Sequence, residues 1–303
     1  MSEPIPAFET RDAYPKGLLA RPEQPGGASL KAVYDRNFRV VRADTDDLRA
    51  HAFRLRYQVY CIENAFEPAP RNPGRRETDE YDRQSRHSLL VHGREGAVVG
   101  TVRLILPRLH SGELPLPIQR VSAADTLAAF AHRMPAGRVA EISRFAITRQ
   151  FRRGAAGMNT ITGAPARIAP SDPARLIPHI SLGLMQAVLA MAIEEEVSHL
   201  CAVMEPTLLR MLQRLGIYFE HLGPAVEYHG HRQPCFCAID DLFVMSRAQR
   251  PDVWAVLTDD GRLNPHFSYP PWSARRYPAD RAGETRSAMP GIGQAARRTL
   301  SAG

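Results

Sequence analysis

The sequence predicts an α/β (α+β) fold in which helices flank a mixed central sheet. Apolar runs rich in β-branched residues, such as 97–106 and 138–147, predict strands. Between the strands lie segments whose apolar residues recur at helical spacing, the longest at 173–197. The chain has 303 residues, of which 44% are apolar and 23% charged, as is typical of a globular protein with a sizeable core. The alternation of the two patterns favours helices layered on a sheet.

The first half of the folded region is predicted to contain three strands and two helices. Thr45 or Asp44 is suited to cap a helix in which apolar residues recur at helical spacing. The expected elements are a strand at 37–42, that helix up to about 60, a loop at 61–85, strands at 87–91 and 97–106, a loop at 107–117 and a short helix at 122–132. A loop as long as 61–85 inside a domain is often functional.

The second half is predicted to contain four strands and three helices. Pro206 lies at a first helical turn and Gly216 just past the end, which is the usual asymmetry of a helix. The expected elements are a strand at 138–147, a Gly-, Ala- and Pro-rich loop at 154–170, the long helix, a strand at 198–204, the helix from Pro206, strands at 217–222 and 234–243, and a helix at 247–257.

Three regions are predicted along the chain. Residues 1–33 are expected to be a disordered leader, because the first 30 are rich in Pro, Gly and charge without periodicity. Residues 34–258 are expected to form one domain, and residues 259–303 a largely disordered C-terminal extension. The leader lacks the apolar core of a signal peptide, and no apolar run of 18 residues occurs, so we expect no transmembrane segment.

Charge and cysteine content narrow the function classes. The net charge is +7, but we find no RNA- or DNA-binding motif and no basic helix, so we expect no nucleic acid partner. A basic rim that docks an acidic protein fits the charge as well. The four cysteines match no zinc pattern and no CxxC redox pair, so we predict no metal site; they are Cys61, Cys201, Cys235 and Cys237. Reduced, mostly buried thiols are typical of a cytoplasmic protein.

The strand at 138–147 carries polar residues in its middle. Successive side chains of a strand point to opposite faces, so Glu141 and Ser143 should share one face and Arg144 the other, unless a bulge intervenes. Arg103 likewise interrupts the apolar strand at 97–106. Since an unpaired buried charge is costly, such residues are paired or used, unless the strand is an edge strand with a solvated face.

These residues belong to a longer ordered set. The set is Arg56, Tyr60, Phe66, Asp79, Asp82, Arg103 and then Glu141-Ile142-Ser143-Arg144-Phe145. Its order and spacing resemble those of LuxI-type acyl-homoserine-lactone synthases, which have Arg–x3–Phe–x5–Trp, a D-x-x-D pair, a strand Arg and E-x-S-R. Tyr60 and Phe66 replace the usual Phe and Trp of that family.

Three further motifs resemble a specific branch of the superfamily. They are Phe53-Arg-x-Arg-Tyr-Gln-Val-Tyr-Cys, Met204-Glu-Pro and Glu227-Tyr-His-Gly. They look like those of the PEP-CTERM/exosortase-associated acyltransferases and their relatives, the N-acyl amino acid synthases. The resemblance runs from about 37 to 243 and implies a GNAT-like acyltransferase fold for the domain.

The resemblance implies an N-acyltransferase that moves a fatty acyl group from a thioester to the amine of an amino acid or similar molecule. The donor would be an acyl carrier protein or acyl-CoA, with no bound cofactor. The pyrophosphate loop [QR]-x-x-G-x-[GA] of GNAT enzymes is not cleanly present, because Phe151 stands three residues before Gly154. That departure favours the carrier protein as donor and partner.

The resemblance also implies roles for individual residues. Glu141 would be the general base, within a catalytic motif that includes Ser143 and Arg144. The positions expected to bind substrate are Arg56, Tyr60, Phe66, Asp79, Asp82, Arg103 and Phe145. Arg149, Arg152 and Arg153 are expected to dock the donor or its carrier, although a solvated basic loop explains them equally well.

Alternatives remain open on the sequence. One is a homoserine-lactone signal synthase that uses S-adenosylmethionine. Another is a non-catalytic protein that binds an acyl group or a carrier protein, although Glu141 is retained. The aspartates and arginines of the motif could also form a structural ion-pair network, which is compatible with a role in substrate binding. The sequence does not define the oligomeric state.

Overall fold

The structure is a computed structural model that describes residues 29–93, 96–107, 115–149, 157–158, 165–166 and 173–264. Most of the predicted leader and of the predicted C-terminal extension lies outside the described residues. Helix α1 (Leu30–Asn37) begins inside the segment predicted as leader, where the Ser29 hydroxyl accepts a hydrogen bond from the Ala32 N–H. A Ser at this position satisfies an amide of the first turn, which explains the start of the helix.

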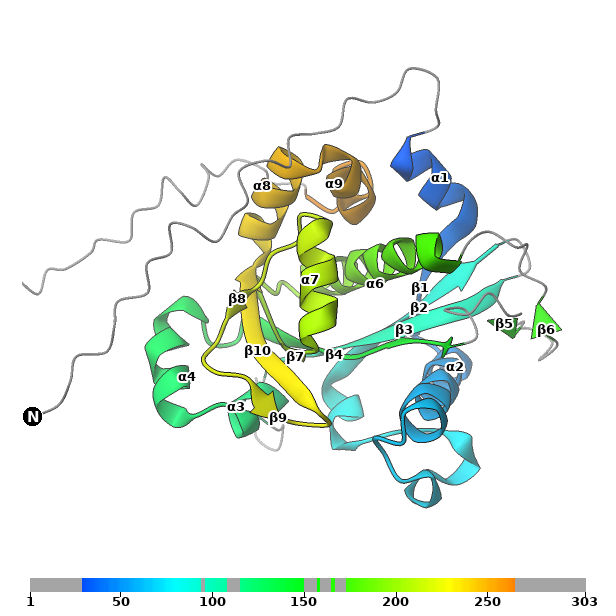
Figure 1. Cartoon of the computed structure of the whole chain (residues 1–303), viewed down its shortest axis with the longest axis horizontal. Coiled ribbons are helices and arrows are strands. Elements are labelled where there is room, and N and C mark those ends of the chain that lie inside the picture. Colours follow the sequence, from blue (N-terminus) through cyan, green and yellow to red (C-terminus); the bar gives the residue numbers. More distant parts are fainter. Residues whose placement is uncertain are drawn as a thin grey trace, which may run out of the picture. The chain divides into compact units, whose positions relative to one another are not determined.

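A mixed sheet organises the described part of the chain (Figure 1). Its strands lie in the order β1 (Phe38–Arg42), β2 (Ser85–His92), β3 (Ala97–Ile105), β4 (Val139–Ile147), β7 (His199–Met204), β10 (His231–Ala238) and β8 (Glu220–His221), with β9 (Val226–Glu227) also paired to β10. The β4–β7 pair is parallel and the others are antiparallel. A separate pair joins β5 (Gly157–Met158) to β6 (Pro165–Ala166), inside the segment predicted as a loop.

Helices cover both faces of the sheet, as Figure 1 shows. One face carries α6 (Pro173–Glu194) together with α1, α7 (Pro206–Arg214), α8 (Ile239–Gln249) and α9 (Pro251–Thr258), and the other carries α2 (Asp46–Arg56). The middle of α6 is buried, including Leu184, Val188 and Leu189 at 0% exposure. Gly183 lets α6 approach the sheet closely, since a Cβ there would stand 2.7 Å from a Leu90 methyl group.

Short helical segments connect these elements. They are the π-helix η1 (Tyr57–Glu63), the 3-10 turns η2 (Ala69–Arg71), η3 (Pro73–Arg75), η4 (Glu80–Gln84) and η5 (Ala131–Arg133), and the helices α3 (Pro117–Val121) and α4 (Ala124–Phe130). The π-helix directly continues α2, so the helix predicted to reach residue 60 changes its hydrogen-bonding pattern at Tyr57. Such segments are frequent at functional sites.

The prediction was wrong at the end of the domain. The strand expected over 234–243 stops at Ala238, and α8 begins at Ile239. Asp240 and Asp241 lie in the first turn of α8, where negative charge complements the helix dipole. The single helix expected over 247–257 is divided at Pro251, which has no N–H to donate and instead starts α9.

The central strands separate from one another beyond the middle of β4. Pairing between β4 and β7 runs from Val139↔His199 to Ile142↔Ala202 and ends there. On its other edge, β4 pairs Ser143 with Arg103 but Ala146 with Thr101, so Arg144 and Phe145 together face one residue of β3. This is a β-bulge, and Arg144 has a φ of +48° in it. The bulge and the divergence of the strands open the sheet at the motif predicted to be catalytic.

Candidate active site

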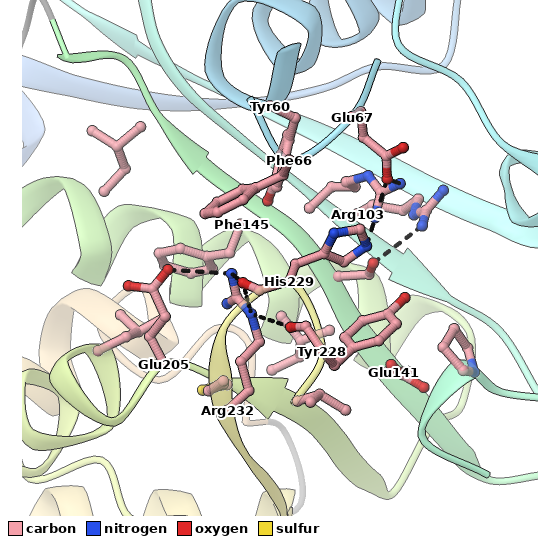
Figure 2. Close-up of a pocket in the computed structure, with 18 of the residues that line it drawn as sticks. Tyr60, Phe66, Glu67, Arg103, Glu141, Phe145, Glu205, Tyr228, His229 and Arg232 are labelled. Carbon is pink, nitrogen blue, oxygen red and sulfur yellow. Dashed lines mark hydrogen bonds and ion pairs between the residues drawn. The ribbon is translucent and has the colours of Figure 1, made fainter. Parts of the chain in front are cut away.

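A cavity of about 330 Å³ lies where β4 and β7 part. Its walls come from segments that are distant in the sequence, among them β4, the start of α7, the β9–β10 hairpin and the loop after the π-helix (Figure 2). The lining residues include Tyr60, Phe66, Glu67, Asp79, Arg103, Glu141, Ser143, Arg144, Phe145, Glu205, Tyr228, His229 and Arg232. Eight of the ten predicted catalytic and substrate-binding residues thus line the cavity together with others that the sequence did not single out, while Arg56 and Asp82 do not line it.

The cavity is apolar at one end. Met204, Leu208 and Met211 line it from β7 and α7, and Ser181 lines it from the long helix. Methionine is unbranched and flexible, so it suits the lining of an acyl slot. Met204 and Met211 do line the cavity, whereas Met185 and Met191 are core residues with 0% exposure.

The motif arginines and acidic residues form a buried ion-pair network. Three guanidinium groups face three carboxylates; the members are Arg56, Arg103, Arg144, Glu77, Asp79 and Asp82. Arg103 donates to Asp79 at 2.5 Å and to Asp82 at 2.8 Å. Its side chain is 1% exposed, and that of Arg56 is fully buried. Each of these arginines contacts two of the three carboxylates, and Arg144 also lies 3.6 Å from Glu67, so no positive charge of the network is left unbalanced.

The β-bulge explains how Arg144 joins this network. Regular alternation would point Arg144 away from Ser143, as the sequence predicted in the absence of a bulge. With the bulge, Arg144 donates to Glu77 at 2.7 Å and to Asp79 at 2.9 Å. Ser143 reaches the same cluster by accepting a hydrogen bond from Arg103 at 3.1 Å. The bulge therefore brings both residues into one site.

Sequence reasoning missed Glu77, which holds two of the three arginines. Its carboxylate accepts from Arg56 at 2.5 Å and from Arg144 at 2.7 Å. Burial raises the pKa of Glu77, but the charges of Arg56 and Arg144 outweigh it and lower that pKa to about 2. Glu77 lies among many charged residues in a loop without periodicity, so no pattern distinguished it.

Glu141 lies on the same strand but outside the network. Its side chain is buried and accepts a hydrogen bond from the backbone N–H of Ile118 at 2.8 Å. Burial raises the pKa of Glu141 to about 8, opposed in part by that hydrogen bond and by the charge of Arg103. At neutral pH this carboxyl group is therefore close to its titration point and able to exchange a proton.

Aromatic side chains form part of the cavity wall. The rings of Tyr60 and Phe66 lie 6.3 Å apart between centroids. The guanidinium of Arg144 lies over the Tyr60 ring at 5.2 Å, and that of Arg232 over the Phe66 ring at 5.6 Å. Cations at such distances are attracted to aromatic faces. The two predicted aromatic positions therefore contact both the motif network and the β9–β10 hairpin.

The β9–β10 hairpin supplies Tyr228, His229 and Arg232 to the cavity (Figure 2). His229 has a φ of +50°, and its ring lies 3.6 Å from a Glu67 carboxylate oxygen. The sequence indicated the motifs at Glu227 and Met204 only as features of the family resemblance, and no role was predicted for His229. A residue-level signal was present, because each motif places polar side chains beside a predicted strand.

The basic residues predicted to dock the donor are only partly described. Arg149 is exposed, and its backbone N–H and Nη2 donate to Glu63 at the end of the π-helix. It does not line the cavity. Arg152 and Arg153 lie outside the described residues, as does Phe151.

Residues 55–161 match the family described as "Acetyltransferase (GNAT) domain". The chain has a GNAT-like fold. No curated protein matches the chain. Within the described part, none of the helices combines the length and apolar character needed to cross a membrane.

The solved structures that resemble the chain include the following three. The acyl-homoserine-lactone (AHL) synthase LasI is 17% identical, covers 71% of this chain and 94% of its own, and has a TM-score of 0.47. FeeM, an N-acyl amino acid synthase from uncultured soil microbes, is 17% identical, with 70% and 97% covered and a TM-score of 0.45. BjaI, a CoA-dependent acyl-homoserine lactone synthase, is 23% identical, with 75% and 89% covered and a TM-score of 0.45.

Proposed function

We propose that the chain is an N-acyltransferase that moves a fatty acyl group from a thioester to the amine of an amino acid or a similar small molecule. The observation that carries the proposal is Glu141, a buried carboxyl group with a pKa raised to about 8, on the wall of a cavity with an apolar end. The ordered motif of the sequence and the match of residues 55–161 to the GNAT domain support it.

The reaction needs a base, and Glu141 suits that role. The acceptor amine loses a proton to the Glu141 carboxylate, directly or through a water, and its nitrogen attacks the thioester carbonyl carbon. A carboxylate with a pKa near 8 is a stronger base than an ordinary one and is better matched to an ammonium group. Collapse of the tetrahedral intermediate breaks the C–S bond, and the thiolate that leaves takes up a proton. The products are an amide and a free thiol.

The opening of the sheet supports a site for the developing oxyanion. Beyond Ile142, β4 no longer pairs with β7, and the cavity borders this stretch. Backbone N–H groups of Glu141–Phe145 would then be available to the carbonyl oxygen of the thioester. Fixed donors aimed at developing charge are among the largest contributions to catalysis.

The ion-pair network would order the substrate loop. It ties the α2 residue Arg56 and the loop residues Glu77, Asp79 and Asp82 to β3 and β4. Holding these segments together fixes the cavity wall that carries Tyr60 and Phe66. Direct contact of the network with the acceptor remains a prediction of the motif resemblance.

The donor is proposed to be an acyl carrier protein or acyl-CoA, with the acyl chain at the apolar end beside Met204 and Met211. The relation to PEP-CTERM/exosortase-associated acyltransferases rests on the sequence motifs. A cytoplasmic location is proposed because the four cysteines are buried and none is in a disulfide.

Thioester turnover tests the proposal. The full chain is mixed with dodecanoyl–acyl carrier protein or dodecanoyl-CoA, the twenty amino acids and S-adenosylmethionine, and thiol release and product mass are followed. We expect an N-dodecanoyl amino acid, and a rate that falls about 100-fold or more in Glu141→Ala. Glu195→Ala, which removes a partner of Arg86 outside the cavity, is the control, and circular dichroism checks folding.

Two other outcomes of this assay would favour the alternative functions. An acyl-homoserine lactone as product would replace this proposal by the signal-synthase alternative. Binding of the acyl carrier protein without thiol release would favour a non-catalytic binding protein.

A further inference from the structure

The cavity contains three arginines, and two of them are already matched in charge. Arg103 and Arg144 lie in the network in which three guanidinium groups face three carboxylates. Arg144 also pairs with Glu67 at 3.6 Å, so a substrate carboxylate placed there would add a further negative charge to a cluster whose guanidinium groups already have carboxylate partners. Burying such a charge without a partner is costly. The motif arginines are therefore poor candidates for binding an anionic substrate.

The third arginine, Arg232, is held differently. Its Nε donates to the backbone oxygens of Tyr228 at 2.9 Å and His229 at 3.3 Å, and its Nη2 donates to His229 O at 3.2 Å. These bonds fix the plane of the guanidinium with uncharged partners. Its side chain is 15% exposed, and Nη1 makes no hydrogen bond within the described residues. Arg232 thus keeps its positive charge at the cavity wall, and the Nη1 side of its guanidinium group is available as a hydrogen-bond donor.

The charge of Arg232 is met by one carboxylate, that of Glu205, among the described residues. The ion pair is 3.3 Å long, and the Glu205 side chain is 51% exposed. Figure 2 shows Glu205, the residue before α7, directed toward Arg232. A half-exposed glutamate exchanges this partner for water at small cost, because exposed ion pairs are weak. Another carboxylate can therefore take its place.

We propose that Arg232 binds the carboxylate of the acceptor, in exchange for Glu205, and so selects amines that carry a carboxylate. The inference rests on the proposed function, because it assigns the acceptor class for the same cavity. Tyr228 lies between Arg232 and Glu141 in Figure 2 and lines the same wall. An amino acid anchored by its carboxylate on Arg232 would extend along Tyr228, with its amine directed toward Glu141. An arginine is suited to this task because it binds a carboxylate with two parallel donors.

Binding of a product analogue tests the inference without turnover. Isothermal titration calorimetry compares N-dodecanoylglycine with its primary amide, which differs in the carboxylate alone. We expect the wild-type chain to bind the acid at least tenfold more tightly than the amide. Arg232→Met should abolish that preference and leave the affinity for the amide within threefold of the wild-type value. Arg232→Lys should retain part of the preference for the acid. Glu205→Gln should tighten binding of the acid two- to fivefold and leave the amide unchanged.

Arg86→Met is the matched control, since Arg86 also pairs with one glutamate but lies outside the cavity. It should keep the full preference for the acid. If Arg232→Met does not fold, the inference is tested by two other results: the preference of the wild-type chain for the acid over the amide, and the tighter binding of the acid expected in Glu205→Gln. Equal binding of acid and amide by the wild-type chain, absence of binding by both, or a preference that survives in Arg232→Met would each overturn the inference.

Turnover separates this inference from the proposed function. Dodecanoyl-N-acetylcysteamine serves as donor, because it carries no phosphate that Arg232 could bind instead. We expect Arg232→Met to lower kcat/KM for glycine at least 30-fold relative to glycinamide. Equal loss for both acceptors would overturn the inference. Acid binding that depends on Arg232, without acylation of any amine, would uphold the carboxylate site and refute the proposed transfer.

Discussion

Glu77 and Arg144 form the closest link between the loop after the π-helix and the bulge of β4: Oε1 of Glu77 lies 2.7 Å from Nη2 of Arg144. The other oxygen of the same carboxylate accepts from Nε of Arg56 at 2.5 Å. Glu77 is 2% exposed. A single carboxylate therefore connects α2 to β4 inside the protein, and its loss would leave two buried arginines without one of their partners.

We expect Glu77→Gln to lower the free energy of unfolding by about 3–5 kcal/mol, the usual cost of removing one partner from a buried ion pair. Urea unfolding followed by circular dichroism measures it. Glu195→Gln in the more exposed pair with Arg86 is the control and should change stability by about 1 kcal/mol or less. Equal effects of the two substitutions would show that the network adds little to stability.

Arg56→Lys tests whether the geometry of the guanidinium matters beyond its charge. Arg56 uses Nε for Glu77 and both Nη atoms for Asp82, so it bridges two carboxylates at once. A lysine keeps the charge but lacks the planar fork, and we expect a loss of about 1–3 kcal/mol in unfolding free energy. Arg49→Lys is the control, because Arg49 forms an exposed pair with Asp46, and it should change the unfolding free energy by no more than about 0.5 kcal/mol. A fully stable Arg56→Lys protein would contradict the bridging role.

Some of this site follows from the sequence and some does not. The strand at 138–147 and the spacing of its polar residues could be predicted, because apolar flanks and alternation are local properties. The bulge at Arg144 could not, since it depends on how β4 pairs with β3. Sequence alternation alone therefore places Arg144 on the wrong face.

The contribution of distant segments was also beyond local patterns. Arg232 and His229 come from a hairpin more than eighty residues after Glu141, and their position depends on the packing of β10 beside β7. The strand predicted over 234–243 was too long, because Ile239, Leu242 and Phe243, which extend the apolar pattern past β10, belong to α8. Motif order singled out the polar residues of β4, whereas tertiary structure brought the hairpin to them.

Glu141 should make stability depend on pH. Its pKa is about 8 in the folded chain, against 4.5 as the ordinary value. Between these values the folded state holds a proton that the unfolded state has lost. The stabilisation present below pH 4.5 is therefore lost as pH rises toward 8, by at most about 1.4 kcal/mol per pH unit. Glu141→Gln cannot titrate, so unfolding free energies of the two proteins, measured by urea from pH 5 to 8, should diverge in favour of the variant. Parallel curves would exclude the raised pKa.

The same group should control the rate. A general base acts only when ionised, and with a pKa near 8 about a tenth of Glu141 is ionised at pH 7. We expect kcat/KM to rise about tenfold per pH unit below pH 8 and to level off above it. The fraction of the acceptor that is present as the free amine also rises with pH. The dependence of kcat/KM on pH is therefore measured with two acceptors whose amine pKa values differ by about two units. An inflection that stays near 8 for both acceptors assigns it to Glu141, whereas one that moves with the acceptor would assign it to the amine and leave Glu141 without a role as base.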